Sequence, residues 1–326
     1  MFTRRLFKYA AISLLLILTA APVRAEEYPS KPVRIITPAP AGVGPDAIAR
    51  LVADRLAQRW GQQVLVLNRP GAGGLIGLRA AVAARADGYS LYMPISSTFV
   101  ALPEKFPNLP LDLRRDLVPI ALIGEQPLVI AVNSKVGINT MKELVTFARK
   151  HPGKLDYGAG QGSLPNLVGE LLQQRAGIKL TFVPYSSTAQ AMQDAVGGTL
   201  QVYIESIAGL AGQLKAGSLK ALAVASDKRL SDRPGLPTVM EALPDIGRFE
   251  ARGWLVLAAR RATPPAILQK VGADVRAVLA LPAVQKRFAA LGTYTKPMSS
   301  SQLTDFIRSE QALWRPIVRR ANLATH

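Results

Sequence analysis

The sequence contains no cysteine and only two histidines, His151 and His326. The lack of cysteine excludes a disulfide framework, a thiolate metal site and a cysteine nucleophile. A serine triad or a histidine-based metal centre is also poorly supplied, because one histidine precedes a proline and the other is the last residue. No Gly-x-Ser-x-Gly elbow occurs, and the acidic residues are dispersed along the chain. We therefore predict a protein that is not an enzyme, with no catalytic residues, metal or cofactor.

Long hydrophobic runs are absent except near the start. Three basic residues precede an apolar run over 10–21, and Val23-Arg24-Ala25 places small residues where a signal peptidase reads. The run is too short to span a bilayer core of roughly 30 Å. We predict a signal peptide over 1–25, cleaved after Ala25, and a periplasmic mature protein. An uncleaved anchor is the alternative, and the pair Arg4-Arg5 leaves the twin-arginine export route open.

Acidic residues are scarce relative to basic ones, with 22 against 40, and the formal charge is +18. Residues 1–25 hold four basic residues and no acids, so the predicted mature chain carries 18 − 4 = +14. Such a charge favours small anionic partners. The basic residues are scattered along the chain without a block or an aromatic-studded stripe, so we predict no nucleic-acid partner.

Strand and helix patterns alternate through most of the chain, which predicts an α/β fold. The expected strands are 33–37, 64–67, 89–93, 120–123, 128–132, 180–183, 200–204, 221–225 and 254–259. The expected helices are 45–59, 76–86, 139–150, 165–175, 188–196, 265–280, 282–291 and 301–321. The proline-rich passage 103–119 shows no clear periodicity. Ligands of open parallel sheets bind beyond the carboxyl ends of strands, so the loops at those ends are the candidate sites.

The first candidate loop follows the strand 33–37 and opens the next helix. Its small residues allow backbone N–H groups to approach a carboxylate, and the helix adds the positive end of its dipole. Asp46 lies in the first helical turn, where it either stabilises the helix start or contacts the ligand. A plain turn is the alternative for the whole loop. The candidate ligand-binding residues are Ala39, Ala41, Gly42, Val43, Gly44 and Asp46.

A second glycine-rich loop, over 157–166, repeats this pattern before another helix with a proline at its start. The candidate residues are Gly160, Gly162, Ser163 and Asn166. A third cluster, Ser96, Ser97 and Thr98, offers hydroxyls at another strand end, where a helix cap is the alternative. The glycines of 71–77 lack the spacing and the following acid of a dinucleotide site, so we interpret them as structural.

Several segments together resemble the periplasmic receptors of tripartite tricarboxylate transporters, of the Bordetella-uptake-gene (Bug) type. The matching segments run in order from Tyr28 to the C-terminus. They are Tyr28-Pro-Ser-Lys-Pro-Val-Arg-Ile-Ile, Asn68-Arg-Pro-Gly-Ala-Gly-Gly, Asp87-Gly-Tyr, His151-Pro-Gly-Lys-Leu-Asp-Tyr, Val183-Pro-Tyr, Leu219-Lys-Ala-Leu-Ala-Val, Pro237-Thr-Val with Glu241, and the strand of Trp254.

The resemblance implies a two-lobed periplasmic-binding-protein fold, type II-like, with two mixed sheets flanked by helices and a hinge of two crossover strands. It implies carboxylate ligands and adds Tyr185 and Glu205 to the candidate site. The chain departs from the family pattern at Ala39, Val43, Pro45, Ala159, Asn166 and Glu205. Because these departures fall in the expected pocket, we hypothesise that the ligand specificity has shifted. Micromolar binding of ordinary citrate or malate would count against this hypothesis.

We therefore expect a first lobe over 26–130 with 227–326, and a second lobe over 131–226. The expected function is capture of a small carboxylate between the lobes for delivery to the permease subunits of a tripartite tricarboxylate transporter, by a monomer. A sensory module for a membrane kinase is the first alternative, and an exported hydrolase is the second.

Overall fold

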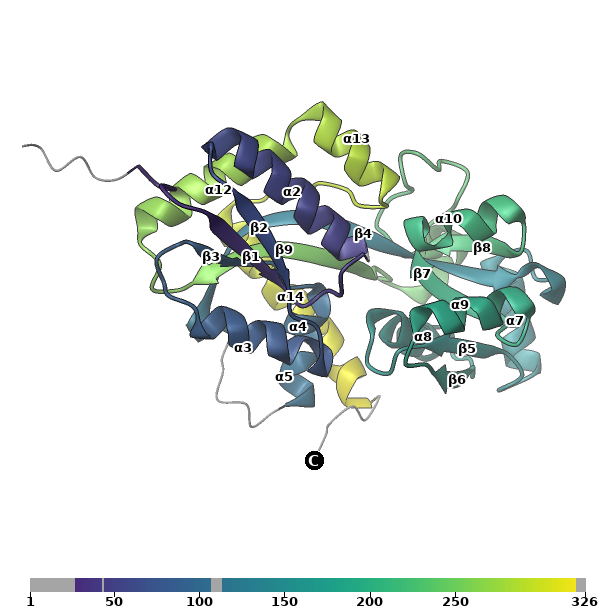
Figure 1. The fold of residues 1–326 in the computed structure, drawn as a ribbon. Coiled ribbons are helices and arrows are strands. Elements are labelled where there is room, and N and C mark those ends of the chain that lie inside the picture. The colour runs from purple at the N-terminus through teal and green to yellow at the C-terminus, as the bar shows by residue number, and fades with distance from the viewer. Residues whose placement is uncertain (1–26, 43, 107–112, 321–326) are drawn as a thin grey trace, which may run out of the picture.

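Residues 27–42, 44–106 and 113–320 are described by a computed structural model, in which two α/β lobes lie side by side (Figure 1). The predicted signal peptide, the candidate residue Val43 and the last residues of the chain lie outside this description. Within the described ranges, no helix is both long enough and apolar enough to cross a membrane.

Sheet A forms the first lobe. Its strands run in the order β2 (Val64–Asn68), β1 (Val33–Thr37), β3 (Ser90–Tyr92), β9 (Arg252–Arg260) and the first part of β4 (Leu117–Asn133). β1 is parallel to β2 and β3, whereas β9 is antiparallel to its neighbours. One face packs on α2 (Gly44–Trp60), α12 (Pro265–Leu279) and α13 (Pro282–Ala290). The other face packs on α3 (Leu75–Ala83), α4 (Ser96–Val100), α5 (Leu102–Lys105) and α14 (Ser300–Arg320), and η1 (Ala72–Gly74) lies against α3 and α4.

Sheet B forms the second lobe. It contains the second part of β4, β7 (Val202–Ser206), β5 (Asp156–Ala159), β6 (Thr181–Pro184) and β8 (Leu219–Val224). β5 is parallel to β6 and β7, which repeats the three parallel strands β2, β1 and β3 of sheet A. One face packs on α7 (Met141–Lys150), α8 (Leu164–Ala176) and α11 (Val239–Ala242), and the other on α9 (Thr188–Gly197) and α10 (Ile207–Ala216).

Both sheets are covered on two faces because their strands are rich in buried aliphatic residues. On α2 the pattern is the expected one: Ile48, Val52 and Leu56 are fully buried on one face. The helix ends at Gly61, whose φ of +63° lies in the left-handed region that favours glycine.

The strand β4 differs from the prediction. Two strands were expected over 120–123 and 128–132, but β4 is a single strand of 17 residues. Its first part pairs with β9 as far as Pro127, and from Leu128 it pairs with β7 and β8. Glu125, Gln126 and Pro127 interrupt the apolar pattern, which is typical of a turn. Pairing with a strand more than a hundred residues away keeps them extended.

The chain crosses between the lobes twice, first along β4 and then from Glu250 into β9. Main-chain hydrogen bonds join the crossing point: Leu128 N donates to Ala251 O, Ala251 N to Ala225 O, and Ala225 N to Leu128 O, at 3.2, 2.8 and 2.8 Å. This matches the expected hinge of two crossover strands. The segment before the return crossover packs on sheet B, since Val224 N donates to Pro237 O and α11 lies against α7 and β8. The lobe boundaries therefore remain a proposal, and this packing favours 128–251 for the second lobe.

Several short helices escaped prediction, namely α5, α6 (Leu113–Asp116), α10, α11 and the 3-10 turns η2 (Ser134–Val136) and η3 (Pro244–Ile246). α10 is rich in small residues, and its apolar periodicity is weak. Its start is set by Ser206, whose Oγ accepts a hydrogen bond from Gly209 N.

Candidate ligand-binding site

The loop before α2 is tied to the helix that it opens. Gly42 has a φ of +83°, and its N–H donates to Asp46 Oδ2 at 2.8 Å. Arg50 Nε donates to the same oxygen at 2.9 Å. Asn68 Nδ2 donates both to Asp46 Oδ1 at 2.8 Å and to Ala39 O at 2.9 Å. The end of β2 therefore holds the loop that follows β1.

These contacts favour one of the two roles that the sequence left open for Asp46. The side chain is buried, and both carboxylate oxygens have partners within the protein. Burial raises the pKa of Asp46, but hydrogen bonds from Arg50, Asn68 and Gly42 outweigh burial and lower it overall. Asp46 is thus an ionised residue that positions the loop, and its charge is engaged before any ligand arrives.

The glycines of 71–77 allow close packing against the same loop, as expected for a structural role. A Cβ on Gly77 would lie 3.1 Å from Pro38 Cβ and 3.1 Å from Arg69 O, so α3 packs closely on the start of the loop. A Cβ on Gly74 would lie 3.1 Å from Thr98 Oγ1. The motif from Asn68 to Gly77 therefore positions the site, although no ligand role was expected for it.

The loop before α8 has the same construction. Gly162 has a φ of +74°, and its N–H donates to Asn166 Oδ1 at 3.0 Å. Asn166 Nδ2 donates to the Tyr157 hydroxyl at 3.2 Å, and that hydroxyl donates to Glu170 Oε1 at 2.7 Å. Asn166 is buried. Here too, a side chain in the first helical turn holds the glycine four residues before it.

The two loops therefore share the pattern Gly-x-x-Pro-Asp/Asn, at 42–46 and at 162–166. Proline occupies the second helical position in each, where a missing N–H leaves no intrahelical bond unmade. By helix geometry, the N–H groups of Gly44 and Asp46 on α2, and of Leu164 and Asn166 on α8, have no acceptor in their own helices. The two loops were predicted to be similar from their glycines. The shared five-residue pattern is a more specific sequence signal for the same similarity.

The hydroxyl residues near these loops are either buried or partly exposed. Ser163 precedes α8 without making a side-chain cap bond, and its buried Oγ has no hydrogen-bond partner among the described residues. Thr98 is buried as well, and its hydroxyl lies beside that of Tyr92. Ser96 is buried, whereas Ser97 is partly exposed. A buried hydroxyl without a partner costs about 1–3 kcal/mol, which a ligand or a water molecule could recover.

Tyr185 and Glu205 lie at the carboxyl ends of β6 and β7. Tyr185 N donates to Ala159 O at 3.0 Å, which places Tyr185 beside the loop, but its hydroxyl donates to Asp194 Oδ2 at 2.6 Å. Burial, together with Asp194, raises the pKa of Tyr185 to about 12, so the phenol stays neutral. β5 and β7 are parallel, and Tyr157 lies opposite Val202. Gly160 and Glu205 each come three residues later, so both lie at the carboxyl ends of these neighbouring strands.

The Glu205 carboxylate accepts a hydrogen bond from Ser206 N at 2.6 Å and forms no ion pair with any described residue. Burial raises its pKa, and the hydrogen bond from Ser206 opposes this effect. A Cβ on Gly209 would lie 2.6 Å from Glu205 Cγ, so α10 packs tightly on this side chain. The sequence reasoning did not foresee this contact with the start of α10.

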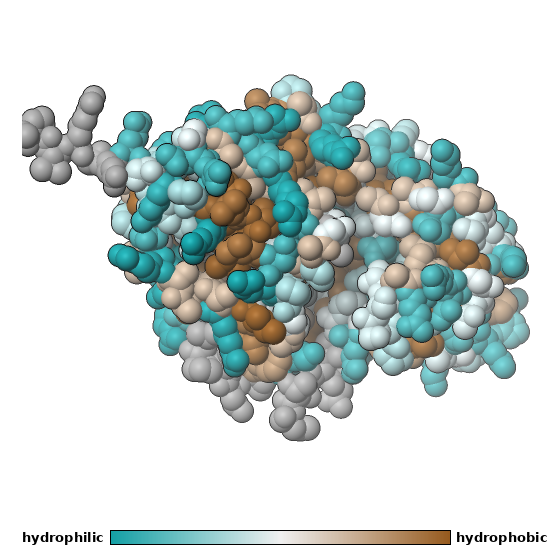
Figure 2. All heavy atoms as spheres, viewed as in Figure 1, coloured by the Kyte–Doolittle hydropathy of each residue, from teal (hydrophilic) through white to brown (hydrophobic). Residues whose placement is uncertain are grey.

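The two loops lie on the sides of their lobes that face each other (Figure 1). The molecular surface is hollowed between the lobes (Figure 2). The first loop is exposed at Ala41, Gly42 and Gly44, whereas Ala39 is buried. No group of three or more His, Asp or Glu side chains that could hold a metal ion occurs in the part of the chain that the structure describes.

Comparison with known proteins identifies the family. The family of tripartite tricarboxylate transporter receptors matches residues 48–323. Protein BugT of Bordetella pertussis is 33% identical over 302 residues, which cover 92% of each chain. The chain therefore belongs to the tripartite tricarboxylate transporter receptor family, of the Bug type that the sequence resembled.

Solved structures agree with this assignment. Rpa4515 of R. palustris with adipate superposes with a TM-score of 0.81 at 26% identity, covering 91% of this chain and 99% of that one. MatC of Rhodopseudomonas palustris with bound malate gives 0.76 at 28%, covering 89% and 100%. The periplasmic binding protein BugD gives 0.76 at 28%, covering 92% and 100%. The two-lobed periplasmic-binding-protein fold is confirmed, and the protein is a solute-binding receptor of this family.

Proposed function

We propose that the receptor captures a small carboxylate-bearing metabolite in the hollow between its lobes and delivers it to the membrane permease subunits of a tripartite tricarboxylate transporter. The repeated Gly-x-x-Pro-Asp/Asn loop carries this proposal, because it aims two helix starts into the space between the lobes. The adipate and malate held by the related Rpa4515 and MatC support a carboxylate ligand.

In this proposal the proximal carboxylate docks on the N–H groups of Gly44 and Asp46 beside the exposed Gly42. The distal end of the ligand meets the start of α8, where Ser163 Oγ has no partner among the described residues. Charge-assisted hydrogen bonds contribute about 1.5–3 kcal/mol each, so three of them at the upper end of this range supply the roughly 8 kcal/mol of micromolar binding. The high positive charge of the chain raises the rate at which an anion arrives.

Native mass spectrometry of the freshly purified protein tests the proposal directly, because it detects a retained small acid. Calorimetry then compares a panel of mono-, di- and tricarboxylates with their neutral amide analogues. We expect binding of at least one acid and none of its amide, because the helix starts favour negative charge. Equal binding of an acid and its amide would contradict the docking of a carboxylate on these amides.

The delivery role is separable from ligand binding. Pull-down with the periplasmic faces of the permease subunits and of a sensor kinase distinguishes transport from signalling, and we expect the permease to be captured. Export is tested by N-terminal sequencing of the periplasmic protein, which we expect to begin at Glu26. Light scattering in solution should give the mass of a monomer.

A further inference from the structure

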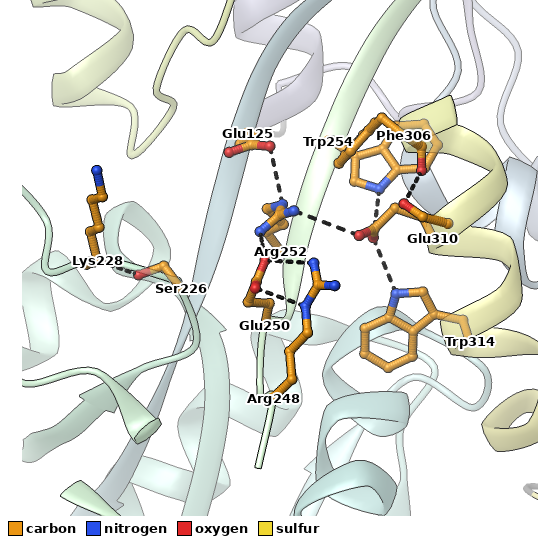
Figure 3. A network of polar contacts seen from close by, with 11 residues as sticks. Glu125, Ser226, Lys228, Arg248, Glu250, Arg252, Trp254, Phe306, Glu310 and Trp314 are labelled. Carbon is orange, nitrogen blue, oxygen red and sulfur yellow. Dashed lines mark hydrogen bonds and ion pairs between the residues drawn. The ribbon is translucent and has the colours of Figure 1, made fainter. Parts of the chain in front are cut away.

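Arg252 lies where the two crossovers meet α14 (Figure 3). It is the first residue of β9, pairs with Pro127 of β4 and follows the hinge residue Ala251. Its side chain is only 5% exposed, and its guanidinium lies 5.5 Å from the ring centre of Phe306 on α14. A charge buried at this depth needs compensating partners.

Three carboxylates from three elements surround this guanidinium. Arg252 Nε lies 3.1 Å from Glu125 Oε1 on β4, and Nη1 donates to Glu250 Oε2 at 2.7 Å on the return crossover. Nη2 lies 3.7 Å from Glu310 Oε1 on α14. Arg248 Nε also donates to Glu250, at 2.9 Å. One guanidinium thus connects β4, the return crossover and α14 beside the hinge.

Glu310 extends the cluster toward the second lobe. Its Oε2 accepts hydrogen bonds from Trp254 Nε1 at 3.1 Å and Trp314 Nε1 at 3.3 Å. Trp314 belongs to the same apolar core as Leu164 and Leu167 of α8, and α14 lies against α8. The helix that opens at Ser163 is therefore packed on the helix that carries Glu310.

The cluster holds more negative than positive charge. Glu125, Glu250 and Glu310 set against Arg248 and Arg252 give 2 − 3 = −1 when all are ionised. Further charges that act on Glu125 are those of Lys296, before α14, and Asp227, after β8.

Burial raises the pKa of Glu125 and of Glu310, with Arg252 opposing it in both cases. At Glu250, hydrogen bonds from Arg248 and Arg252 outweigh burial and lower the pKa. A carboxyl with a raised pKa takes up a proton before the ordinary carboxyls of the chain do, so Glu125 and Glu310, like Glu205, respond early to falling pH.

We propose that the Arg252 cluster is a proton-sensitive latch on the interlobe hinge. With its carboxylates ionised, Arg252 holds β4, the return crossover and α14 in one arrangement. Proton uptake by Glu125 or Glu310 removes an ion pair from that arrangement and shifts the equilibrium between lobe separations. The inference goes beyond ligand capture and does not depend on which ligand the protein binds. A clamp that is only structural would hold one lobe separation at every pH at which the protein is folded.

Distance measurement by pulsed electron spin resonance tests the latch without any ligand. Because the sequence has no cysteine, two spin labels are placed cleanly by Asp54→Cys on α2 and Gln190→Cys on α9, which are both exposed. We expect the distance distribution to change between about pH 8 and about pH 5, above the range where ordinary carboxyls titrate. Glu310→Gln should show the low-pH distribution at every pH, because glutamine still accepts the two indole hydrogen bonds but carries no charge.

Asp305→Asn is the matched control, since Asp305 is an exposed carboxylate on the same helix. It should keep the pH response of the parent protein. Glu125→Gln provides a second variant, and circular dichroism checks that each variant is folded. A distribution that is identical across this pH range in the parent protein would overturn the proposal. So would an unchanged pH response in both folded glutamine variants.

Discussion

The loops that open α2 and α8 share one backbone arrangement but differ in charge. In each, a glycine in the left-handed region donates its N–H to a side chain four residues later. The acceptor in the first lobe is the carboxylate of Asp46, which Arg50 and Asn68 also bind. The acceptor in the second lobe is the neutral amide of Asn166, which donates onward to Tyr157.

This difference shows that the turn requires an oxygen at that position but not a charge. A carboxylate is compatible with an anion site only where a cation already compensates its charge. Arg50 compensates the charge of Asp46 in this way. No described cation binds Asn166, and an uncompensated carboxylate there would face the ligand. Four predictions, each with a matched pair of substitutions, test this comparison.

Removing Asp46 should have the largest effect. Asp46→Ala leaves Gly42 N without its acceptor, removes one of the two acceptors of Asn68 Nδ2 and breaks the ion pair of Arg50, so we expect a loss of about 3 kcal/mol in the free energy of unfolding. Asn166→Ala should lose about 1–2 kcal/mol, because the bonds it breaks are neutral. Urea titration measures both, and an equal loss in the two variants would contradict the comparison.

Adding a charge to the second loop should act mainly on binding. Asn166→Asp keeps an oxygen for Gly162 N but places a carboxylate without a cation near the ligand and near Glu170. We expect the affinity for the retained acid to fall by about 100-fold, or about 2.7 kcal/mol. Asp46→Asn serves as the counterpart and should weaken folding more than binding. Calorimetry showing full affinity in Asn166→Asp would refute the charge argument.

Substitution of Ser163 should lower the affinity for the ligand without destabilising the fold. Its Oγ is buried without a partner among the described residues, so Ser163→Ala should not lower the free energy of unfolding, and it should lower the affinity about 10-fold. Ser206→Ala is the control, because Ser206 Oγ does cap α10, and its loss should destabilise the protein by about 1 kcal/mol. A stability loss in Ser163→Ala equal to that in Ser206→Ala would assign Ser163 to the helix instead.

The smallest expected effect is that of adding a methyl group at Gly42. A comparison with Gly61 separates the cost of backbone strain from an effect on ligand binding. Gly42 and Gly61 both have a positive φ, and a Cβ on either would meet no atom within 4 Å. Gly42→Ala and Gly61→Ala should therefore each lose about 1–2 kcal/mol of stability. Only Gly42→Ala should weaken ligand binding, because its methyl group would stand at the exposed loop. Thermal unfolding and calorimetry on both variants check this, and equal affinities would remove Gly42 from the site.

Most of the strands and helices could be predicted because their signals are local. The apolar spacing of α2, the β-branched run of β1 and the helix-ending glycines depend on neighbours within one or two turns. The prediction of β4 was wrong because Glu125, Gln126 and Pro127 remain extended only through pairing with β9. The packing of the segment before the return crossover on sheet B also leaves no periodic signal in the sequence.

The sequence alone determined the family, the α/β alternation and the two glycine-rich loops, because each is written in residues that lie close together along the chain. Only the tertiary structure decided that Asp46 is held by Asn68, that Ser163 Oγ is buried without a partner in the described part of the chain, and that Glu125, Arg252 and Glu310 form one cluster. Those contacts join residues far apart in sequence, and whether a charge is compensated depends on which distant side chains folding brings beside it.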